Sequence, residues 1–246
     1  METMNPSSGS GSDVVLFGFE RSTYVNVVRL VLLAKGVSFA FHDTETEMYT
    51  PNHEKRHPFG RVPVLRHRDF WLYETAAIAL YVDERFPGPA LQPADPEQRA
   101  RGYQWISNLN AYFYPYMVYY LVHERIVFPA LGIEPDEALV AEALPKIEHA
   151  LAVLNDQLGN TSYIAGDAPS LADYFLLPSL TALGFTPEGA SSLPRFADVQ
   201  RWLSRMNELP AVLELLRRLP PFEPIEHARH WVKDHRPAPR ASADAR

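Results

Sequence analysis

A proline-rich segment divides the chain into two parts with different hydrophobic patterns. Residues 87–96 read PGPALQPADP, with four prolines and no periodic apolar positions, which is typical of a linker between domains. Before this segment, short apolar runs alternate with helical stretches, whereas after it apolar residues recur at helical spacing throughout. The pattern predicts a small α/β domain over residues 13–87, a linker over 88–96 and an all-helical bundle over 97–220.

The first part opens with a βαβ pattern and continues with a hairpin. In the hairpin, GRVPVLRHRDFWLYET, two short apolar runs flank a turn. The expected elements are a strand over Val14–Phe19, a helix over Tyr24–Lys35 that Gly36 ends, a strand over Val37–Thr44, the hairpin within residues 60–75, and a helix over Thr75–Phe86.

The second part carries several apolar stripes at helical spacing. One helix start is also marked by its capping residues: in APSLADYFLLP, Ser170 can cap the backbone while Asp173 reaches back, with Pro169 and Tyr174 spaced for a hydrophobic staple. The expected stripes are Trp105, Leu109, Tyr112, Phe113, Tyr116 and Tyr120; Val140, Leu144, Ile147, Leu151, Leu154 and Leu158; Phe196, Val199, Trp202, Leu203 and Met206; and Val212, Leu215, Leu216 and Leu219.

Composition excludes several classes of function. The net charge of −7 and the lack of a basic stripe predict no nucleic-acid or anionic-membrane partner. No apolar stretch approaches the roughly 20 residues of a membrane span, and the first residues lack a signal peptide's apolar segment, so a cytoplasmic location is expected. Residues 1–12 and most of the extension 221–246 are expected to be disordered. Without cysteine, the chain has no thiolate of its own, so any sulfur chemistry would use a sulfur brought by the substrate.

A proline in the hairpin points to a binding site. Pro63 has no N–H for a ladder, but a cis Val62–Pro63 bond would turn the Val62 backbone outward to pair with an extended peptide. Glu74 and Thr75 follow at a helix start, where free N–H groups favour a carboxylate and the Glu74 carboxylate favours an ammonium. The residues alone predict either a site for a short peptide with a free amino-acid end, or an edge proline beside an ordinary helix N-terminus.

Four segments resemble the cytosolic glutathione transferases in order and spacing: GFERSTYVNVVRLVLLAKG, PFGRVPVL, LYETAAIALYVDERFPG and GDAPSLADYFLLP. The resemblance covers roughly residues 14–218, and four motifs in order are more specific than any one. It implies a thioredoxin-like domain, an all-helical domain and usually a homodimer, in a phi- or theta-like bacterial member of the serine type. In that family the Val–Pro bond is cis, Val62 pairs with the cysteinyl backbone of glutathione, and Glu74 and Thr75 hold its γ-glutamyl group.

The resemblance also identifies the residue that would activate the glutathione thiol. Phe17 and Phe19 stand where the tyrosine-type enzymes place their tyrosine, and Ser22 stands at the strand-to-helix turn, as in the serine type. The Ser22 hydroxyl and the helix dipole would stabilise the thiolate without a general base. Ser22 could instead be only a helix cap, and Thr23 or Tyr24 could take its role.

The loop before Val62 supplies the candidates for the glycyl carboxylate of glutathione. Arg61 is the best charged candidate, and His53 and Lys55 are alternatives. His53 and His57 also form a literal H-E-x-x-H, for which Glu74 is an imaginable third zinc ligand. Pro58 follows at once and the flanks are polar, which favours a charged surface loop and predicts no metal.

Aromatic residues in AYFYPYMVYYLVHERIVFP, residues 111–129, lie where this family has the wall of the electrophile pocket. Tyr112, Tyr116, Met117 and Tyr120 are the candidates, although aromatics at helical spacing commonly belong to a core. The resemblance therefore implies a glutathione transferase that conjugates glutathione to an apolar electrophile. The same site could serve an isomerase, etherase or dehalogenase, and the fold could serve a non-catalytic ligand-binding protein. The missing cysteines disfavour a thiol–disulfide oxidoreductase.

Overall fold

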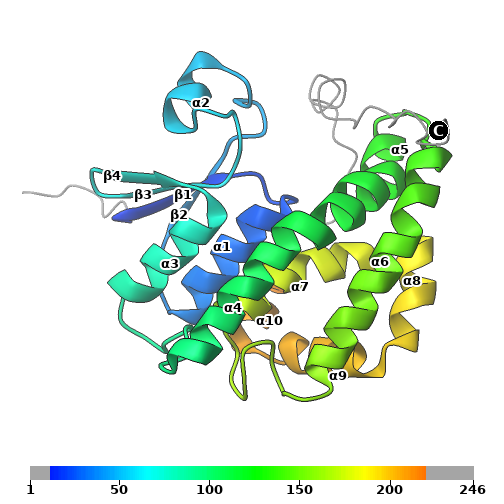
Figure 1. The fold of residues 1–246 in the computed structure, drawn as a ribbon. Coiled ribbons are helices and arrows are strands. Elements are labelled where there is room, and N and C mark those ends of the chain that lie inside the picture. The colour runs from blue at the N-terminus through cyan, green and yellow to red at the C-terminus, as the bar shows by residue number, and fades with distance from the viewer. Residues whose placement is uncertain (1–11, 220–246) are drawn as a thin grey trace, which may run out of the picture.

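The computed structural model describes residues 12–219, which form a small α/β domain followed by helices (Figure 1). The terminal segments predicted to be disordered lie outside the described residues, apart from Ser12. The first domain consists of β1 (Val14–Gly18), α1 (Thr23–Ala34), β2 (Ala40–Asp43), α2 (Pro51–Arg56), β3 (Val64–His67), β4 (Phe70–Tyr73) and α3 (Thr75–Arg85).

The second part consists of helices in the described range, two of them π-helical. They are α4 (Pro96–Asn108), the π-helices η1 (Leu109–Phe113) and η2 (Pro115–Val127), α5 (Phe128–Ala130), α6 (Glu137–Leu158), α7 (Leu171–Gly184), α8 (Pro187–Ser192), the 3₁₀ turn η3 (Leu193–Arg195), α9 (Ala197–Asn207) and α10 (Pro210–Arg218). Within residues 12–219, none of the helices combines the length and the apolar character that a bilayer crossing requires.

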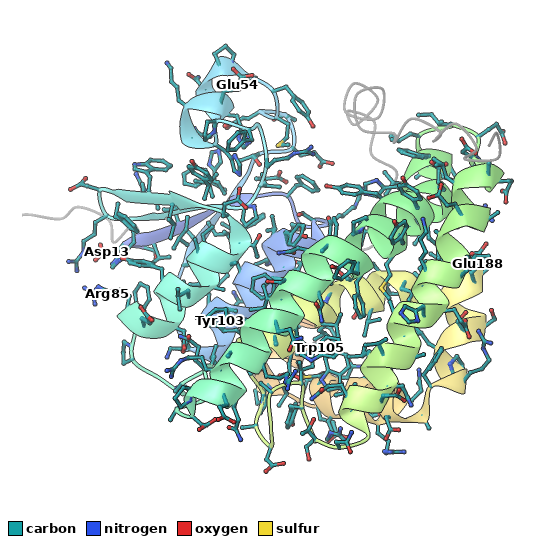
Figure 2. All side chains as sticks on the ribbon, viewed as in Figure 1. Asp13, Glu54, Arg85, Tyr103, Trp105 and Glu188 are labelled. Atoms are coloured by element: carbon teal, nitrogen blue, oxygen red, sulfur yellow. The ribbon has the colours of Figure 1, made fainter. Side chains whose placement is uncertain are left out.

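The sheet of the first domain has the strand order β2-β1-β3-β4. β1 is parallel to β2 and antiparallel to β3, and β3 is antiparallel to β4, so the predicted βαβ-ββα order is confirmed. Helices α1 and α3 lie together against one side of the sheet, while α2 stands off on the opposite side, where Figure 2 labels Glu54 (Figures 1 and 2). This is the thioredoxin-like arrangement, and it places the start of α1 beside the segment that precedes β3.

The hairpin differs from its predicted form at its first strand. The Val62–Pro63 peptide bond is cis, and β3 begins only at Val64, which pairs with Phe17. Because Pro63 has no N–H, the ladder cannot extend through it. Outside the hairpin, β2 is also shorter than the strand predicted over Val37–Thr44. Gly36 turns the chain with φ 66°, and β2 begins only at Ala40.

Helix α1 is buried along most of its length because it lies between the sheet and the helical domain. Its residues from Val25 to Leu32 are all buried, and α1 packs on α3 as well as on α7 and α10. Apart from Asn26 and Arg29, this stretch is apolar on every side, which is the pattern expected of such a central position. The two domains therefore share one hydrophobic core.

The linker predicted at 88–96 is held by hydrogen bonds to the first domain. Lys35 Nζ lies 3.0 Å from Asp83 Oδ1 and 2.8 Å from the Pro89 carbonyl, and the Leu91 N–H donates to the same carboxylate at 2.9 Å. The side chains of Lys35 and Asp83 are both buried, so each charge relies on the other. These bonds fix where the second domain begins, at α4.

The predicted capping box at α7 is confirmed. The Ser170 N–H donates to Asp173 Oδ2 at 2.9 Å, and the other carboxylate oxygen accepts from the Ile164 N–H and from Trp202 Nε1 at 2.7 Å. Burial raises the pKa of Asp173, while these three hydrogen bonds and a fourth from the Ser170 hydroxyl at 2.7 Å oppose that rise. The motif thus joins the start of α7 to α9 as well as capping it.

The apolar stripe predicted from Trp105 to Tyr120 is only partly buried. Trp105 is 6% exposed and faces inward, whereas Tyr103, on another side of α4, is 38% exposed (Figure 2). Beyond α4 the hydrogen bonds change: the Tyr114 N–H donates to Leu109, five residues back, as in a π-helix. A π-helix has more residues per turn than an α-helix, so the stripe drifts and Tyr112 is 65% exposed.

Candidate active site

A cavity of about 1720 Å³ lies between the first domain and the helices η2, α7 and α10. Small-molecule sites usually measure about 300–1,000 Å³, so this cavity has room for two ligands side by side. One part is lined by polar segments of the first domain, including the turn before α1 and the start of α3. The other part is lined mainly by apolar side chains of the helical domain.

Ser22 lines the cavity and also caps α1. Its φ of −67° and ψ of 122° are extended, and its Oγ accepts a hydrogen bond from the Val25 N–H at 3.3 Å. Because Oγ is the acceptor in that bond, its own proton is left to donate. Within residues 12–219 this hydroxyl donates to no protein group. The helix-cap role therefore coexists with a free O–H at the positive end of α1.

The two alternatives to Ser22 have hydroxyls that are already engaged. Thr23 Oγ1 donates to the Tyr114 hydroxyl at 3.2 Å, and the Tyr24 hydroxyl donates to Asn110 Oδ1 at 2.8 Å. The rings of Tyr24 and Tyr114 stack with centroids 4.3 Å apart. Burial raises the pKa of both phenols well above the ordinary value, so neither ionises near neutral pH. Of these three hydroxyls, the one of Ser22 is left to donate to a bound ligand.

Glu74 and Thr75 line the cavity at the start of α3, and Val62 lines it beside them. Glu74 has φ 71°, a conformation that costs a residue other than glycine about 1–3 kcal/mol. Its side chain caps no backbone group of α3, is exposed, and helps to raise the pKa of Tyr24 across the cavity. The structure thus brings Val62, Glu74 and Thr75 together with Ser22, as predicted.

Arg61 and His57 form the neighbouring wall. Burial lowers the pKa of His57 to about 4, and the charges of His53 and Arg61 add to that effect. The His57 Nδ1 accepts from the Phe59 N–H at 3.3 Å, which leaves Nε2 to carry the proton of a neutral ring. The sequence does not indicate that His57 lines the cavity, because its one visible signal there is the H-E-x-x-H spacing.

Two of the predicted glutathione-binding residues lie outside the cavity lining. His53 is fully buried, and its Nε2 bonds the Arg61 carbonyl at 3.0 Å, so it supports the Arg61 backbone from behind. Lys55 is exposed on α2 and is absent from the cavity wall.

The H-E-x-x-H motif does not form a metal site of the usual kind. His57 follows the last residue of α2, so His53 and His57 do not share a helical face. Across residues 12–219 no three potential ligands cluster in a way that could hold a metal ion.

The predicted acceptor-pocket residues also need correction. Tyr112 is exposed, Met117 is fully buried, and Tyr116 packs edge-on against Tyr120 with centroids 5.4 Å apart. None of the four lines the cavity. The residues that face the cavity recur about every four positions, like the predicted ones, but they are offset by two residues along the helix. The lining residues from this region are Asn110, Tyr114, Val118, Tyr119, Val122, His123, Ile126 and Val127.

Helices α7 and α10 complete the apolar part of the cavity. Phe175 and Pro178 of α7 face it from one side, and Val212, Leu215 and Leu216 face it from α10. Leu216 is 48% exposed, so part of its side chain is open to solvent at the cavity wall. The predicted apolar stripe of α10 thus provides one wall of the site.

Comparisons with known proteins agree with this arrangement. Residues 16–90 match the family model "Glutathione S-transferase, N-terminal domain", and residues 109–210 match "Glutathione S-transferase, C-terminal domain". Glutathione S-transferase 1 of Zea mays is 31% identical over 71% of this chain and 81% of its own length. Glutathione S-transferase F13 of Arabidopsis thaliana is 33% identical over 66% of this chain and 77% of its own.

Solved structures show the same fold. Glutathione S-transferase III in its apo form superposes with a TM-score of 0.78 at 29% identity, covering 86% of this chain and 99% of that one. Glutathione S-transferase I from maize, in complex with an atrazine glutathione conjugate, gives 0.76 at 27% identity, covering 85% and 98%. With the fold, both family models and relatives above 30% identity in agreement, the chain belongs to the glutathione S-transferase family.

Proposed function

We propose that this glutathione transferase activates the thiol of glutathione with Ser22 and presents it to an apolar electrophile. The observation that carries the proposal is the meeting, in one cavity, of a hydroxyl with an uncommitted proton, a carboxylate held at the start of α3, and the backbone beside a cis-proline. Each of these groups suits a different part of a γ-glutamyl tripeptide.

Glutathione would lie along the polar wall. Its cysteinyl backbone would pair with Val62, which lies just outside the β3 ladder. Its γ-glutamyl ammonium would face the Glu74 carboxylate, while its γ-glutamyl carboxylate would meet the free N–H groups at Thr75. Its glycyl carboxylate would meet Arg61, the guanidinium next to Val62 on the same wall.

Ser22 would stabilise the ionised thiol. The Oγ proton donates to the sulfur anion, and the positive end of the α1 dipole adds a favourable potential. The thiol proton passes to solvent, so no general base is needed. The thiolate then forms a bond to the electrophilic carbon, and the leaving group departs with the electrons of its own bond. The un-ionised phenols of Tyr24 and Tyr114 place no competing anion beside the sulfur.

The apolar wall would hold the electrophile, and Leu216 allows a matched test of that role. Leu216→Asp should raise the KM for an apolar aryl acceptor about tenfold, because it replaces apolar contact by a hydrated charge. The KM for glutathione should stay within about twofold. Leu213, 54% exposed on the same helix, is not part of the cavity wall, so Leu213→Asp is the control. Equal acceptor kinetics in the two variants would contradict the assignment.

A homodimer and a cytoplasmic location stay predictions from the family resemblance. The exposed aromatic side chains of Phe59, Phe70 and Trp71 give the first domain apolar surface of the kind that subunits bury against each other. Light scattering of the purified protein should therefore give about twice the chain mass of 27.9 kDa. A mass of one chain at micromolar concentration would contradict the dimer.

A further inference from the structure

A buried polar pair lies directly beneath the turn that carries Ser22. Asn26 and Arg29 are 9% and 3% exposed, and both belong to the otherwise apolar buried stretch of α1. Asn26 is one helical turn after Ser22, and it also reaches the cavity wall. Buried polar side chains are costly unless they make specific hydrogen bonds, so the contacts of this pair indicate what it does.

Asn26 is bonded to the Ser22 turn at two points. Its backbone N–H donates to the Ser22 carbonyl at 3.0 Å, and its Nδ2 donates to the Glu20 carbonyl at 2.9 Å. The turn itself is closed by the Ser22 N–H, which donates to the Phe19 carbonyl at 3.2 Å. Of these three hydrogen bonds, only the one from the Asn26 side chain can be removed by a substitution, because the other two join backbone atoms. It fixes the peptide plane two residues before the thiolate-stabilising hydroxyl.

Arg29 holds Asn26 in that orientation. Its Nη1 donates to Asn26 Oδ1 at 3.4 Å, and its Nη2 lies 3.9 Å from a Glu20 carboxylate oxygen. Because Oδ1 accepts from the guanidinium, the Asn26 amide is oriented with Nδ2 toward the Glu20 carbonyl. The Arg29 guanidinium therefore acts on the turn in two ways: directly at the Glu20 carboxylate, and through the Asn26 amide at the Glu20 carbonyl.

The burial of the Arg29 charge is only partly compensated by its contacts. Its Nε has no hydrogen-bond partner in the described part of the chain, and its guanidinium stands over the Phe41 ring at 5.1 Å. Burial lowers the pKa of Arg29, Glu20 opposes this, and Arg218 of α10 adds repulsion. Replacing a buried charge by an apolar residue of similar volume is often neutral or stabilising. A positive charge kept at this point indicates a role beyond packing.

We propose that Asn26 and Arg29 are positioning residues for the thiolate: together they hold the Phe19–Ser22 turn so that the Ser22 hydroxyl faces the sulfur of glutathione. This inference rests on the proposed role of Ser22. Small displacements of a catalytic group cost large factors in rate, so a loosened turn should weaken the Ser22 contact even if the helix still forms.

The test compares the thiol pKa of bound glutathione, measured by thiolate absorbance, in Asn26→Leu and in the wild type. Leu has similar size and lacks the amide, so the thiol pKa should rise and kcat/KM at pH 6.5 should fall about tenfold. In the Ser22→Ala background, Asn26→Leu should add no further rise, because it acts through Ser22. Arg29→Lys, which keeps the charge, should retain more of the effect than Arg29→Met, and it provides a second route if Asn26→Leu does not fold.

Asn155→Leu is the matched control. Asn155 Oδ1 accepts from the Asp198 N–H at 2.9 Å, which is the same kind of amide-to-backbone contact but lies in the helical domain. The Asn155→Leu variant should have a lower unfolding temperature than the wild type but the same thiol pKa of bound glutathione. An Asn26→Leu variant that behaves like this control, or that shifts the thiol pKa equally in the Ser22→Ala background, would overturn the inference. A wild-type thiol pKa equal to that of free glutathione would overturn the proposed function itself and this inference with it.

Discussion

Replacing Ser22 by Ala is expected to lower kcat/KM about 100-fold near neutral pH, because a single donor to a developing or bound anion contributes that much when it is preorganised. The loss should shrink as pH rises. The hydroxyl favours the thiolate over the thiol, so its removal raises the thiol pKa, and at high pH glutathione ionises without help. Measuring kcat/KM for an aryl halide from pH 5.5 to 9 checks both the size and the direction of the effect.

The neighbouring hydroxyls provide the controls for this prediction. Thr23→Val removes the bond to Tyr114, and Tyr24→Phe removes the bond to Asn110, without touching the Ser22 proton. Each should change kcat/KM by less than about tenfold and should leave the pH profile in place. If Ser22→Ala retained the wild-type profile, and Thr23→Val or Tyr24→Phe displaced it, the thiolate would have to be assigned to another hydroxyl.

Glu74→Gln should raise the KM for glutathione by about 10- to 100-fold, since a hydrogen bond to a charged group contributes roughly 1.5–3 kcal/mol. The kcat should change little, because the carboxylate meets the γ-glutamyl end and not the sulfur. Stability should be unaffected, as the Glu74 side chain makes no cap bond to α3. Steady-state kinetics at saturating acceptor measure the split between KM and kcat.

A truncated substrate distinguishes the two ends of the binding site. γ-Glutamylcysteine lacks the glycine, so Arg61→Leu should weaken glutathione binding but should leave γ-glutamylcysteine binding unchanged. Glu74→Gln should weaken both, because both ligands carry the γ-glutamyl ammonium. Arg68→Leu, at the exposed hairpin turn where Arg68 pairs with Asp13, is the charge-matched control. A uniform loss for both ligands in Arg61→Leu would place the glycyl carboxylate elsewhere.

Much of the fold could be predicted because its signals are local. Gly36 ends α1 through a positive φ, Pro63 delays the start of β3, and Ser170 with Asp173 caps α7. Each follows from the chemistry of a few adjacent residues. The same holds for the polar half of the site. The residues near Ser22, Val62 and Glu74 lie at element ends that the pattern locates, and the resemblance supplied their roles.

The apolar half could not be predicted in the same way. The spacing of Tyr112 and Tyr116 indicates one face of a helix, whereas the face that lines the cavity is a neighbouring one that includes Tyr114 and Val118. Both faces carry aromatic or apolar residues, so the local sequence does not tell which of them lies toward the cavity and which packs on other helices. The contribution of α10 likewise depends on tertiary contacts, since Leu216 reads as one more residue of an amphipathic stripe.

The most direct test of the account is the ultraviolet absorbance of the thiolate of bound glutathione, titrated against pH in the wild type and in Ser22→Ala. A free thiol of this kind ionises near pH 8.5. We expect a clearly lower thiol pKa in the wild-type complex and a return toward the free value in Ser22→Ala. A bound thiol that titrates like free glutathione in the wild type would contradict thiolate stabilisation at Ser22, and a protein that binds no glutathione would leave the site to a non-catalytic ligand.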